Sequence, residues 1–237
     1  MKNGKQPLID WSCIERFIGY GNLDAPIVFV GMEEGLASTK ALSEDLLLRS
    51  GFAPVMDAEV AHRGLAKGPS LFSDKPRRQP TWRVMADVML HYEGATFPSD
   101  KERARARKSY RAKRLGREAC DSLLMELLPY PNKKKSEWLY SEKYSNRDDY
   151  VAHVLPERLR LLSNALHQHD RRAIICYGRD DWKHFKALFP EDMRWTSVGR
   201  FDCATWKGAK VTLTDHFATK YFNTNDQLDE LSSITLP

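Results

Sequence analysis

The stretch IVFVG at residues 27–31 is a continuous run of apolar, largely β-branched residues that a glycine closes. Such a run is typical of a strand that is buried on both faces of a parallel sheet. Three further runs have the same character: DSLLMELL at 121–128, AIICYG at 173–178 and AKVTLTD at 209–215. The chain is therefore expected to contain four buried strands.

Helical segments lie between and around these strands. In most of them apolar residues recur every three to four positions, as on a helix with one buried face, and they span residues 8–20, 37–50, 81–92, 100–117, 146–168, 180–189 and 224–234. The alternation predicts an α/β fold, in which a four-stranded, mainly parallel sheet is flanked by helices. The 237 residues fit a single domain, 1–237.

Glycines and prolines set the expected ends of several elements. The segment GMEEGLAS at 31–38 is expected to turn directly after the first strand, and PYPNKKK at 129–135 is expected to end the second. Pro156 is expected in the first turn of its helix. Residues 61–81 contain several glycines and prolines, which predicts a long surface loop.

Composition narrows the class of protein. The chain is 42% apolar, but no run of about 18 apolar residues occurs and the first residues have no apolar signal core. We therefore expect a cytoplasmic protein without a membrane segment. The four cysteines form no CxxC pair, so neither a zinc ribbon nor an iron–sulfur cluster is indicated, and we expect no cofactor.

Positive charge is concentrated in one segment. Residues 101–117, KERARARKSYRAKRLGR, hold nine basic residues and one acid, whereas the whole chain carries a net charge of only +5. A local concentration of this kind is typical of a nucleic-acid-binding surface, and a solvated helix face without a ligand is the alternative.

Polar side chains follow or interrupt three of the predicted strands. Glu33 and Glu34 follow the first strand, Glu126 lies within the second, and His216 follows the fourth. The carboxyl ends of parallel strands share one edge of the sheet, where such folds bind their ligands. Carboxylates that face an imidazole support general-base chemistry and stabilise a cationic sugar. A metal site is the rival for the same residues, although their spacing matches no known metal motif.

Three segments of the chain resemble sequence motifs of the uracil-DNA-glycosylase superfamily. GMEEG at 31–35 is similar to the motif after that family's first strand, and AIICYGRDDW at 173–182 is similar to its third-strand segment. VTLTDHFATKYFNTNDQLDEL at 211–231 resembles its last motif, in which a strand ends in His-Pro-Ser before a closing helix. The resemblance implies a three-layer sandwich that acts on a base flipped out of DNA.

The resemblance also implies roles for single residues. Glu33 stands where the family orients a water, with Glu34 beside it, and His216 stands where the family donates to the departing base. It implies base contacts by Gly31, Met32, Gly35 and Glu126, and Tyr130, which follows the second strand, is expected to stack on the flipped base. Glu34 replaces a proline of the family motif, and Phe217–Ala218 replaces Pro-Ser, so the chain departs from ordinary uracil enzymes.

The residue at position 126 indicates the target base. The family's amide there both donates and accepts, whereas a carboxylate only accepts and would favour the amino group of cytosine. Gly35 leaves space on the C5 side of the base. The sequence therefore predicts excision of a C5-modified cytosine, such as the glucosylated hydroxymethylcytosine of some phage DNA, in antiviral defence.

DNA is the expected partner, double- or single-stranded, and we expect no obligate protein partner. The expected DNA contacts comprise Arg77, Arg78, Lys133, Lys134, Lys135, Lys220 and Tyr221, the last as a wedge in the base stack. Three alternatives stay open: an inactive nucleic-acid-binding module, an enzyme that acts on free nucleosides or nucleotides, and a lyase that uses Lys220. Each candidate side chain also has a purely structural alternative.

Overall fold

In a computed structural model, which describes residues 8–134 and 136–237, the chain forms one mixed sheet of eight strands. The strands are β1 (Gly19–Gly21), β2 (Ile27–Gly35), β3 (Val55–Met56), β4 (Ser122–Asn132), β5 (Ala173–Tyr177), β6 (Thr196–Val198), β7 (Phe201–Trp206) and β8 (Ala209–Thr214). Their order across the sheet is β3-β1-β4-β2-β5-β8-β7-β6. The α/β class is confirmed, and the expected number of four strands is wrong.

The four strands expected from the sequence form the centre of the sheet. β2 pairs in parallel with β4 on one side and with β5 on the other, and β5 pairs in parallel with β8. Residues 27–30 are all fully buried. Burial on both faces explains why this strand has no alternation of polar and apolar residues.

The four additional strands lie at the edges of the sheet. β1 pairs antiparallel with β4 and parallel with β3, while β7 pairs antiparallel with both β8 and β6. β1, β3 and β6 are only two or three residues long, too short for a periodic pattern. β7 and β8 are joined by Lys207 and Gly208, which both have positive φ (49° and 84°), as a two-residue hairpin turn requires.

The strands β2 and β4 are longer than expected. β2 continues through the predicted turn to Gly35, and β4 continues through Pro129 and Pro131 to Asn132. β1 pairs with β4 only at residues 123–125, so the later residues of β4 pair on one side only, with β2. Prolines are tolerated there because no ladder on that side needs their missing N–H groups.

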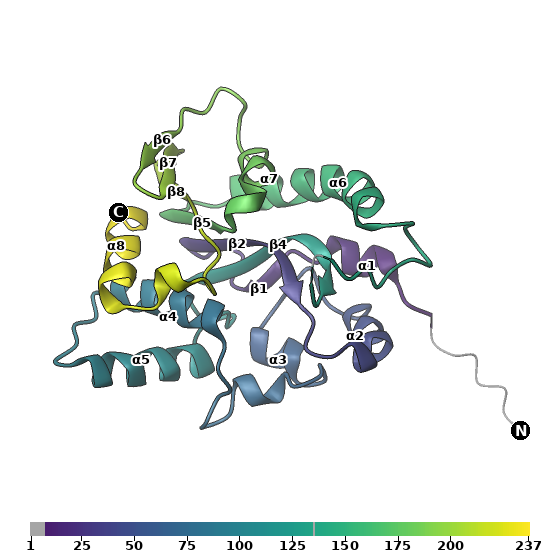
Figure 1. The fold of residues 1–237 in the computed structure, drawn as a ribbon, viewed down its shortest axis with the longest axis horizontal. Coiled ribbons are helices and arrows are strands. Elements are labelled where there is room, and N and C mark those ends of the chain that lie inside the picture. The colour runs from purple at the N-terminus through teal and green to yellow at the C-terminus, as the bar shows by residue number, and fades with distance from the viewer. Residues whose placement is uncertain (1–7, 135) are drawn as a thin grey trace, which may run out of the picture.

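Eight α-helices are found in the described residues: α1 (Trp11–Arg16), α2 (Leu42–Arg49), α3 (Ala58–His62), α4 (Pro80–Tyr92), α5 (Asp100–Lys113), α6 (Arg147–His167), α7 (Trp182–Lys186) and α8 (Asn225–Thr235). One apolar core packs residues of α1, α6 and α7 against the sheet. A second core packs α3, α4, α5 and α8 against the opposite face. Figure 1 shows α6 and α7 on one side of the sheet and α3, α4 and α5 on the other. Within the described ranges, no helix has the length and apolarity needed to cross a bilayer.

One expectation about the helical regions is wrong, and another is confirmed only in part. Pro156 lies in the middle of α6 instead of its first turn. Pro156 and Ala152, one turn earlier, are both exposed, so water can bind the Ala152 carbonyl that loses its helical partner. The predicted loop at 61–81 contains the end of α3 and a short 3-10 helix, η2 (Pro69–Leu71).

One face of the basic helix α5 is internal, which corrects the interpretation of 101–117 as an entirely solvent-facing charged surface. Arg103, Arg107 and Arg111 are buried. Arg103 and Arg107 bind the fully buried Asp87 of α4, and Arg111 donates to the backbone carbonyls of Pro76 and Arg77. These side chains attach α5 to the rest of the fold, so less charge is available to a partner than the sequence indicates.

Candidate functional site

A cleft of about 570 Å³ lies at the carboxyl ends of the parallel strands. We call it the strand-end cleft. It is lined by residues that include Glu33, Trp82, Glu126, Lys133, Tyr177 and His216. The chain leaves β2 toward β4 on one side and later returns to β5 on the other, so the strand order reverses at this point. Ligands of open α/β sheets bind at such a reversal.

Most of the predicted site residues line this cleft. They are Met32, Glu33, Glu34, Gly35, Glu126, Lys133, Lys134 and His216. The shared edge of parallel strands brings them together although they are up to 184 positions apart, from Met32 to His216. Lys135 lies outside the described residues.

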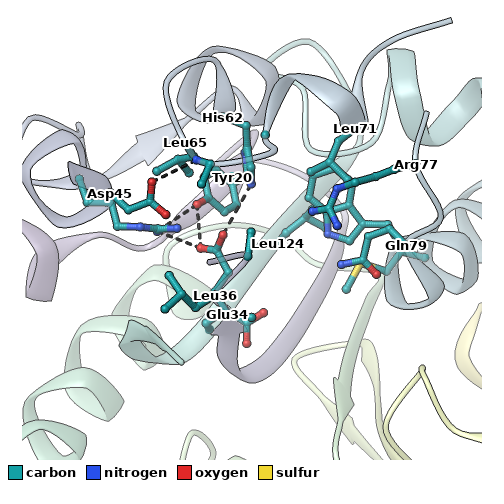
Figure 2. A pocket seen from close by; sticks show the side chains of 18 of the residues that line it. Tyr20, Glu34, Leu36, Asp45, His62, Leu65, Leu71, Arg77, Gln79 and Leu124 are labelled. Atoms are coloured by element: carbon teal, nitrogen blue, oxygen red, sulfur yellow. Dashed lines mark hydrogen bonds and ion pairs between the residues drawn. The ribbon is translucent and has the colours of Figure 1, made fainter. Parts of the chain in front are cut away.

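A smaller chamber of about 80 Å³ continues from the cleft into the protein. We call it the inner chamber, and Figure 2 shows it lined by Tyr20, Glu34, His62 and Gln79 among others. It shares Glu34, Gly35, Gln79, Trp82, Glu126 and Tyr177 with the cleft. The two spaces therefore meet at the end of β2. Several water-sized groups fit in a chamber of this volume.

Glu33 is held by the first residue of α6. Arg147 Nη1 donates to both carboxylate oxygens of Glu33, each at 2.8 Å, and the Glu33 side chain is only 9% exposed. The guanidinium orients the carboxylate at the wall of the cleft. A carboxylate offers about four lone-pair sites, so Glu33 is able to accept more hydrogen bonds than the two from Arg147.

Glu34 belongs to a separate network at the bottom of the inner chamber. It accepts from the Tyr20 hydroxyl at 2.8 Å and from Arg49 Nη1 at 2.9 Å, and His62 Nε2 lies 3.6 Å away (Figure 2). Burial alone would raise the pKa of this carboxyl, but the charge of Arg49 and the contacts with His62 hold the pKa far below its usual range. Glu34 is therefore a fixed negative charge in the chamber wall.

Glu126 and Tyr177 meet above Gly31. Gly31 and Glu126 are paired across β2 and β4, and the Tyr177 hydroxyl donates to Glu126 Oε1 at 2.8 Å. A Cβ on residue 31 would lie 2.1 Å from Glu126 Oε2 and 2.3 Å from the Tyr177 hydroxyl oxygen. The space that Gly31 leaves is thus needed by the two side chains, and Gly31 supports the site without lining the cleft.

The protonation of Glu126 corrects the argument that position 126 only accepts. Burial raises the pKa of the Glu126 carboxyl to about 8; the Tyr177 hydrogen bond opposes the rise, and the charges of Glu34 and Glu33 add to it. The Oε2 atom is buried and has no hydrogen-bond partner among the described residues. At neutral pH the group is therefore mostly a carboxylic acid, which donates as well as accepts.

This raised pKa predicts a pH-dependent stability. The folded-state pKa of about 8 lies above the ordinary 4.5, so the folded chain holds one more proton than the unfolded chain between these values. The contribution of Glu126 to the free energy of unfolding is complete below pH 4.5 and is lost as pH rises to 8. The free energy of unfolding falls by up to about 1.4 kcal/mol per pH unit in this range. Urea unfolding between pH 5 and pH 9 should therefore show that the free energy of unfolding of Glu126→Gln increases relative to that of the wild type as pH rises. An unfolding free-energy difference that is flat with pH would contradict the raised pKa.

His216 lies just after β8 and is exposed at the cleft. The Ala218 backbone N–H donates to His216 Nδ1 at 3.2 Å, and the ring makes an edge contact with Tyr177 at 5.7 Å between centroids. Because a backbone N–H only donates, Nδ1 accepts, and the neutral ring carries its hydrogen on Nε2. His216 can therefore donate to a ligand from Nε2.

The expectation that Tyr130 stacks on a flipped base is wrong. Tyr130 is 0% exposed. Its ring stacks on Tyr150 with 4.8 Å between centroids, and its hydroxyl donates to Glu15. The Tyr130 ring is therefore completely buried in the apolar core that packs α1, α6 and α7 against the sheet. Trp82 and Tyr177 are the aromatic side chains that line the cleft.

The residues after His216 divide between core and surface. Phe222 is fully buried, whereas Tyr221 is 36% exposed and Lys220 is also exposed. The Arg200 guanidinium lies 3.8 Å from the centroid of the Tyr221 ring. Tyr221 is thus half-covered by a cation and lies two residues after Thr219 of the cleft wall.

Arg77 and Arg78 are both exposed, and Arg77 lines the inner chamber. The backbone carbonyl of Arg77 accepts from the buried Arg111 at 2.9 Å, so α5 holds the loop that carries these residues. The basic helix thus contributes to the site indirectly, by positioning a loop.

Several site residues could not be identified from the sequence. Arg147 begins a long helix, and His62 and Arg49 lie on short ones, with no local pattern that separates them from surface residues. Tyr177 had a usable signal, because it is the last residue of a buried strand that ends at the site edge.

A group of possible metal ligands lies away from the cleft-lining residues: Asp87, His91 and Asp229. Arg103 Nη2 lies 2.6 Å from an Asp87 oxygen and 2.7 Å from an Asp229 oxygen. A guanidinium therefore already neutralises these carboxylates, which gives the group a structural role.

Comparison with models of protein families and with curated proteins finds no match to this chain. Its function is therefore inferred from the side chains of the cleft and the inner chamber.

Proposed function

We propose that this protein is a DNA glycosylase of the uracil-DNA-glycosylase-like type, which hydrolyses the N-glycosidic bond of a flipped base. The observation that carries the proposal is that Glu33 of β2, Glu126 of β4 and His216, just after β8, line one cleft at the strand order reversal. A carboxylate, a neutral carboxylic acid and an imidazole donor in one cleft are suited to a reaction with a cationic sugar and an anionic leaving base.

In this mechanism the base enters the strand-end cleft after flipping from the helix. His216 donates from Nε2 to the base as negative charge develops on it. Glu33 stabilises the positive sugar and takes a proton from a water, whose oxygen bonds to C1′ as the C1′–N bond breaks. The base leaves as an anion with the bonding electron pair and then takes a proton from solvent, while Glu33 returns the proton of the water to solvent, and an abasic site remains.

The inner chamber favours a base with a substituent at C5. Gly35 stands where the cleft and the chamber meet, and nothing lies within 4 Å of the position that its Cβ would occupy. Beyond it, Tyr20, His62 and Gln79 offer an aromatic face and polar groups to a hydroxyl-bearing substituent. We propose a C5-modified cytosine, such as glucosylated hydroxymethylcytosine, as the target, excised from phage DNA in the cytoplasm.

The first experiment is a base-release assay. Duplexes that contain cytosine, uracil, hydroxymethylcytosine or glucosylated hydroxymethylcytosine are incubated with the protein, and abasic sites are scored by alkaline cleavage. We expect release from a modified-cytosine duplex and none from the cytosine duplex. Salt-sensitive binding without release from any duplex would contradict the proposal and favour an inactive binding module.

The cleft lysines are expected to contact phosphates. Lys133 and Lys134 are exposed at its rim, so the double substitution Lys133→Ala/Lys134→Ala should reduce the slope of log affinity against log salt by roughly 1–2. The matched pair Lys101→Ala/Lys108→Ala removes the same charge from the exposed face of α5. Filter binding at several salt concentrations compares them. A larger change in the α5 pair would place the phosphate contacts on that helix instead.

A second candidate is hydrolysis of a free nucleoside or nucleotide in the same cleft. The observation that favours it is the burial of Arg103, Arg107 and Arg111, which removes charge otherwise available to a DNA backbone. Release of base from free 5-hydroxymethylcytidine at a rate above that from DNA would support this candidate over the glycosylase.

A further inference from the structure

We propose that Glu126 reads the base as a neutral acid: its Oε2–H faces ring position 3 and donates to the bare N3 of a cytosine-type base. This inference rests on the proposed function, because it assumes a base in the strand-end cleft. It replaces recognition by a carboxylate, which would place a negative oxygen opposite the N3 lone pair.

The hydrogen bond from Tyr177 determines which oxygen carries the proton. The Tyr177 hydroxyl donates to Oε1 at 2.8 Å, so Oε1 acts as the carbonyl oxygen of the acid and the hydrogen resides on Oε2. Burial and the nearby Glu126 raise the pKa of Tyr177 well above its ordinary value, so the tyrosine remains a donor.

The second oxygen of the Glu126 carboxyl, Oε2, takes no part in the hydrogen bond with Tyr177. It is buried and has no hydrogen-bond partner within residues 8–134 and 136–237. A buried polar atom without a partner is costly unless a ligand or a water satisfies it. The Glu126 side chain lines both the cleft and the inner chamber, and Oε2 lies in the space above Gly31, so the carboxyl of Glu126 is the group that a base in the cleft meets.

The charged groups around Glu126 favour its neutral form. Glu33 and Glu34 on β2 repel a negative charge at position 126, and both outweigh Arg158 of α6 in their effect on the pKa. Arg158 Nη2 binds the backbone carbonyl of Glu126 at 2.7 Å, and its remaining bonds go to other backbone carbonyls. No ion pair of the Glu126 carboxyl is found among the described residues.

A neutral acid distinguishes the two pyrimidines. Cytosine has an acceptor at N3 and an amino donor at C4, so it accepts from Oε2–H and can donate to Oε1. Uracil has an N–H at position 3, which would face the Oε2–H donor. A site with the wrong donor pattern rejects a ligand strongly, because buried polar groups then remain unpaired.

The test uses the free product bases, so that it does not depend on catalysis. Calorimetry measures the affinity for 5-hydroxymethylcytosine and 5-hydroxymethyluracil at pH 7 and pH 9, with wild-type protein and Glu126→Gln. With a pKa of about 8, the acid fraction falls about tenfold between these pH values. We expect wild-type affinity for 5-hydroxymethylcytosine to fall about tenfold, and weak binding of 5-hydroxymethyluracil at pH 7.

Glu126→Gln is the informative variant, because its amide N–H₂ can take the place of Oε2–H while Tyr177 still donates to the carbonyl oxygen. We expect it to bind 5-hydroxymethylcytosine at pH 7 within about tenfold of the wild type and to show no change at pH 9. Glu126→Ala removes the donor and should lose this binding at both pH values.

Opposite results would overturn the inference. If wild-type affinity is unchanged or rises at pH 9, or if Glu126→Gln abolishes binding while folding normally, then an ionised carboxylate reads the base. Absence of binding of either base would also reject Glu126 as the reading group. Binding with the expected pH dependence, but no base release from any duplex, would support the inference and contradict the glycosylase.

Discussion

Glu33→Gln is expected to slow base release by about 10²–10⁴-fold at saturating protein, while DNA binding stays within a few-fold of the wild type. Glutamine has the shape of glutamate but cannot take a proton from water or stabilise a cationic sugar by its charge. It also loses the ion pair with Arg147, whose Nη1 contacts both Glu33 oxygens at 2.8 Å. Single-turnover release of the modified base measures the effect.

Two variants make this result specific. Asp180→Asn removes a negative charge from an exposed carboxylate of the same cleft and should leave the release rate unchanged. His216→Ala removes the Nε2 donor and should also slow release strongly, because the leaving base is no longer stabilised. If Glu33→Gln released base at the wild-type rate, Glu33 would have only a structural role through Arg147.

Asp87→Ala is expected to lower the free energy of unfolding by about 3–5 kcal/mol. Asp87 is 0% exposed and accepts from Arg103 Nη2 at 2.6 Å, Arg103 Nε at 3.0 Å and Arg107 Nη1 at 3.2 Å. Its removal takes the anion from the buried guanidinium of Arg107 and leaves the buried Arg103 with the half-exposed Asp229. The cost of an uncompensated buried charge exceeds the value of the lost bonds alone.

Urea unfolding at pH 7 measures this loss. Lys108→Ala, at an exposed position of α5, is the control and should change the unfolding free energy by less than about 0.5 kcal/mol. A loss below about 1 kcal/mol in Asp87→Ala would mean that water or a rearranged partner neutralises the two arginines.

Long buried elements of the fold were predictable, and short or exposed ones were not. The run at 27–31 identified β2 because a strand that is buried on both faces needs only apolar residues. β1, β3 and β6 are too short to show a pattern, and Lys207–Gly208 was the one local signal of the β7–β8 hairpin. The prediction that the second strand ends before Pro129 and Pro131 was wrong. A proline is tolerated in a strand where one side has no partner, and the sequence does not show which side of β4 is paired.

The clustering of the candidate side chains was predictable where chain topology alone decided it. Glu33, Glu126 and His216 were placed together because parallel strands end at one edge, and they line one cleft. The prediction for Tyr130 was wrong, because the exposure of its ring depends on aromatic neighbours in the core. These neighbours come from separate elements of the fold. The assignment of Arg103 and Arg107 to a charged surface was wrong for the same reason, because Asp87 on another helix binds them.

The amino-acid sequence thus specifies the α/β class, the four central strands and the edge where their polar ends gather, because these follow from periodicity and chain order. The three-dimensional contacts specify the chemical state of that edge. Arg147 orients Glu33, Arg49 keeps Glu34 charged, and burial beside two carboxylates protonates Glu126. Charge state depends on solvation and on neighbours within a few ångströms, and these neighbours come from parts of the chain that sequence patterns leave unrelated.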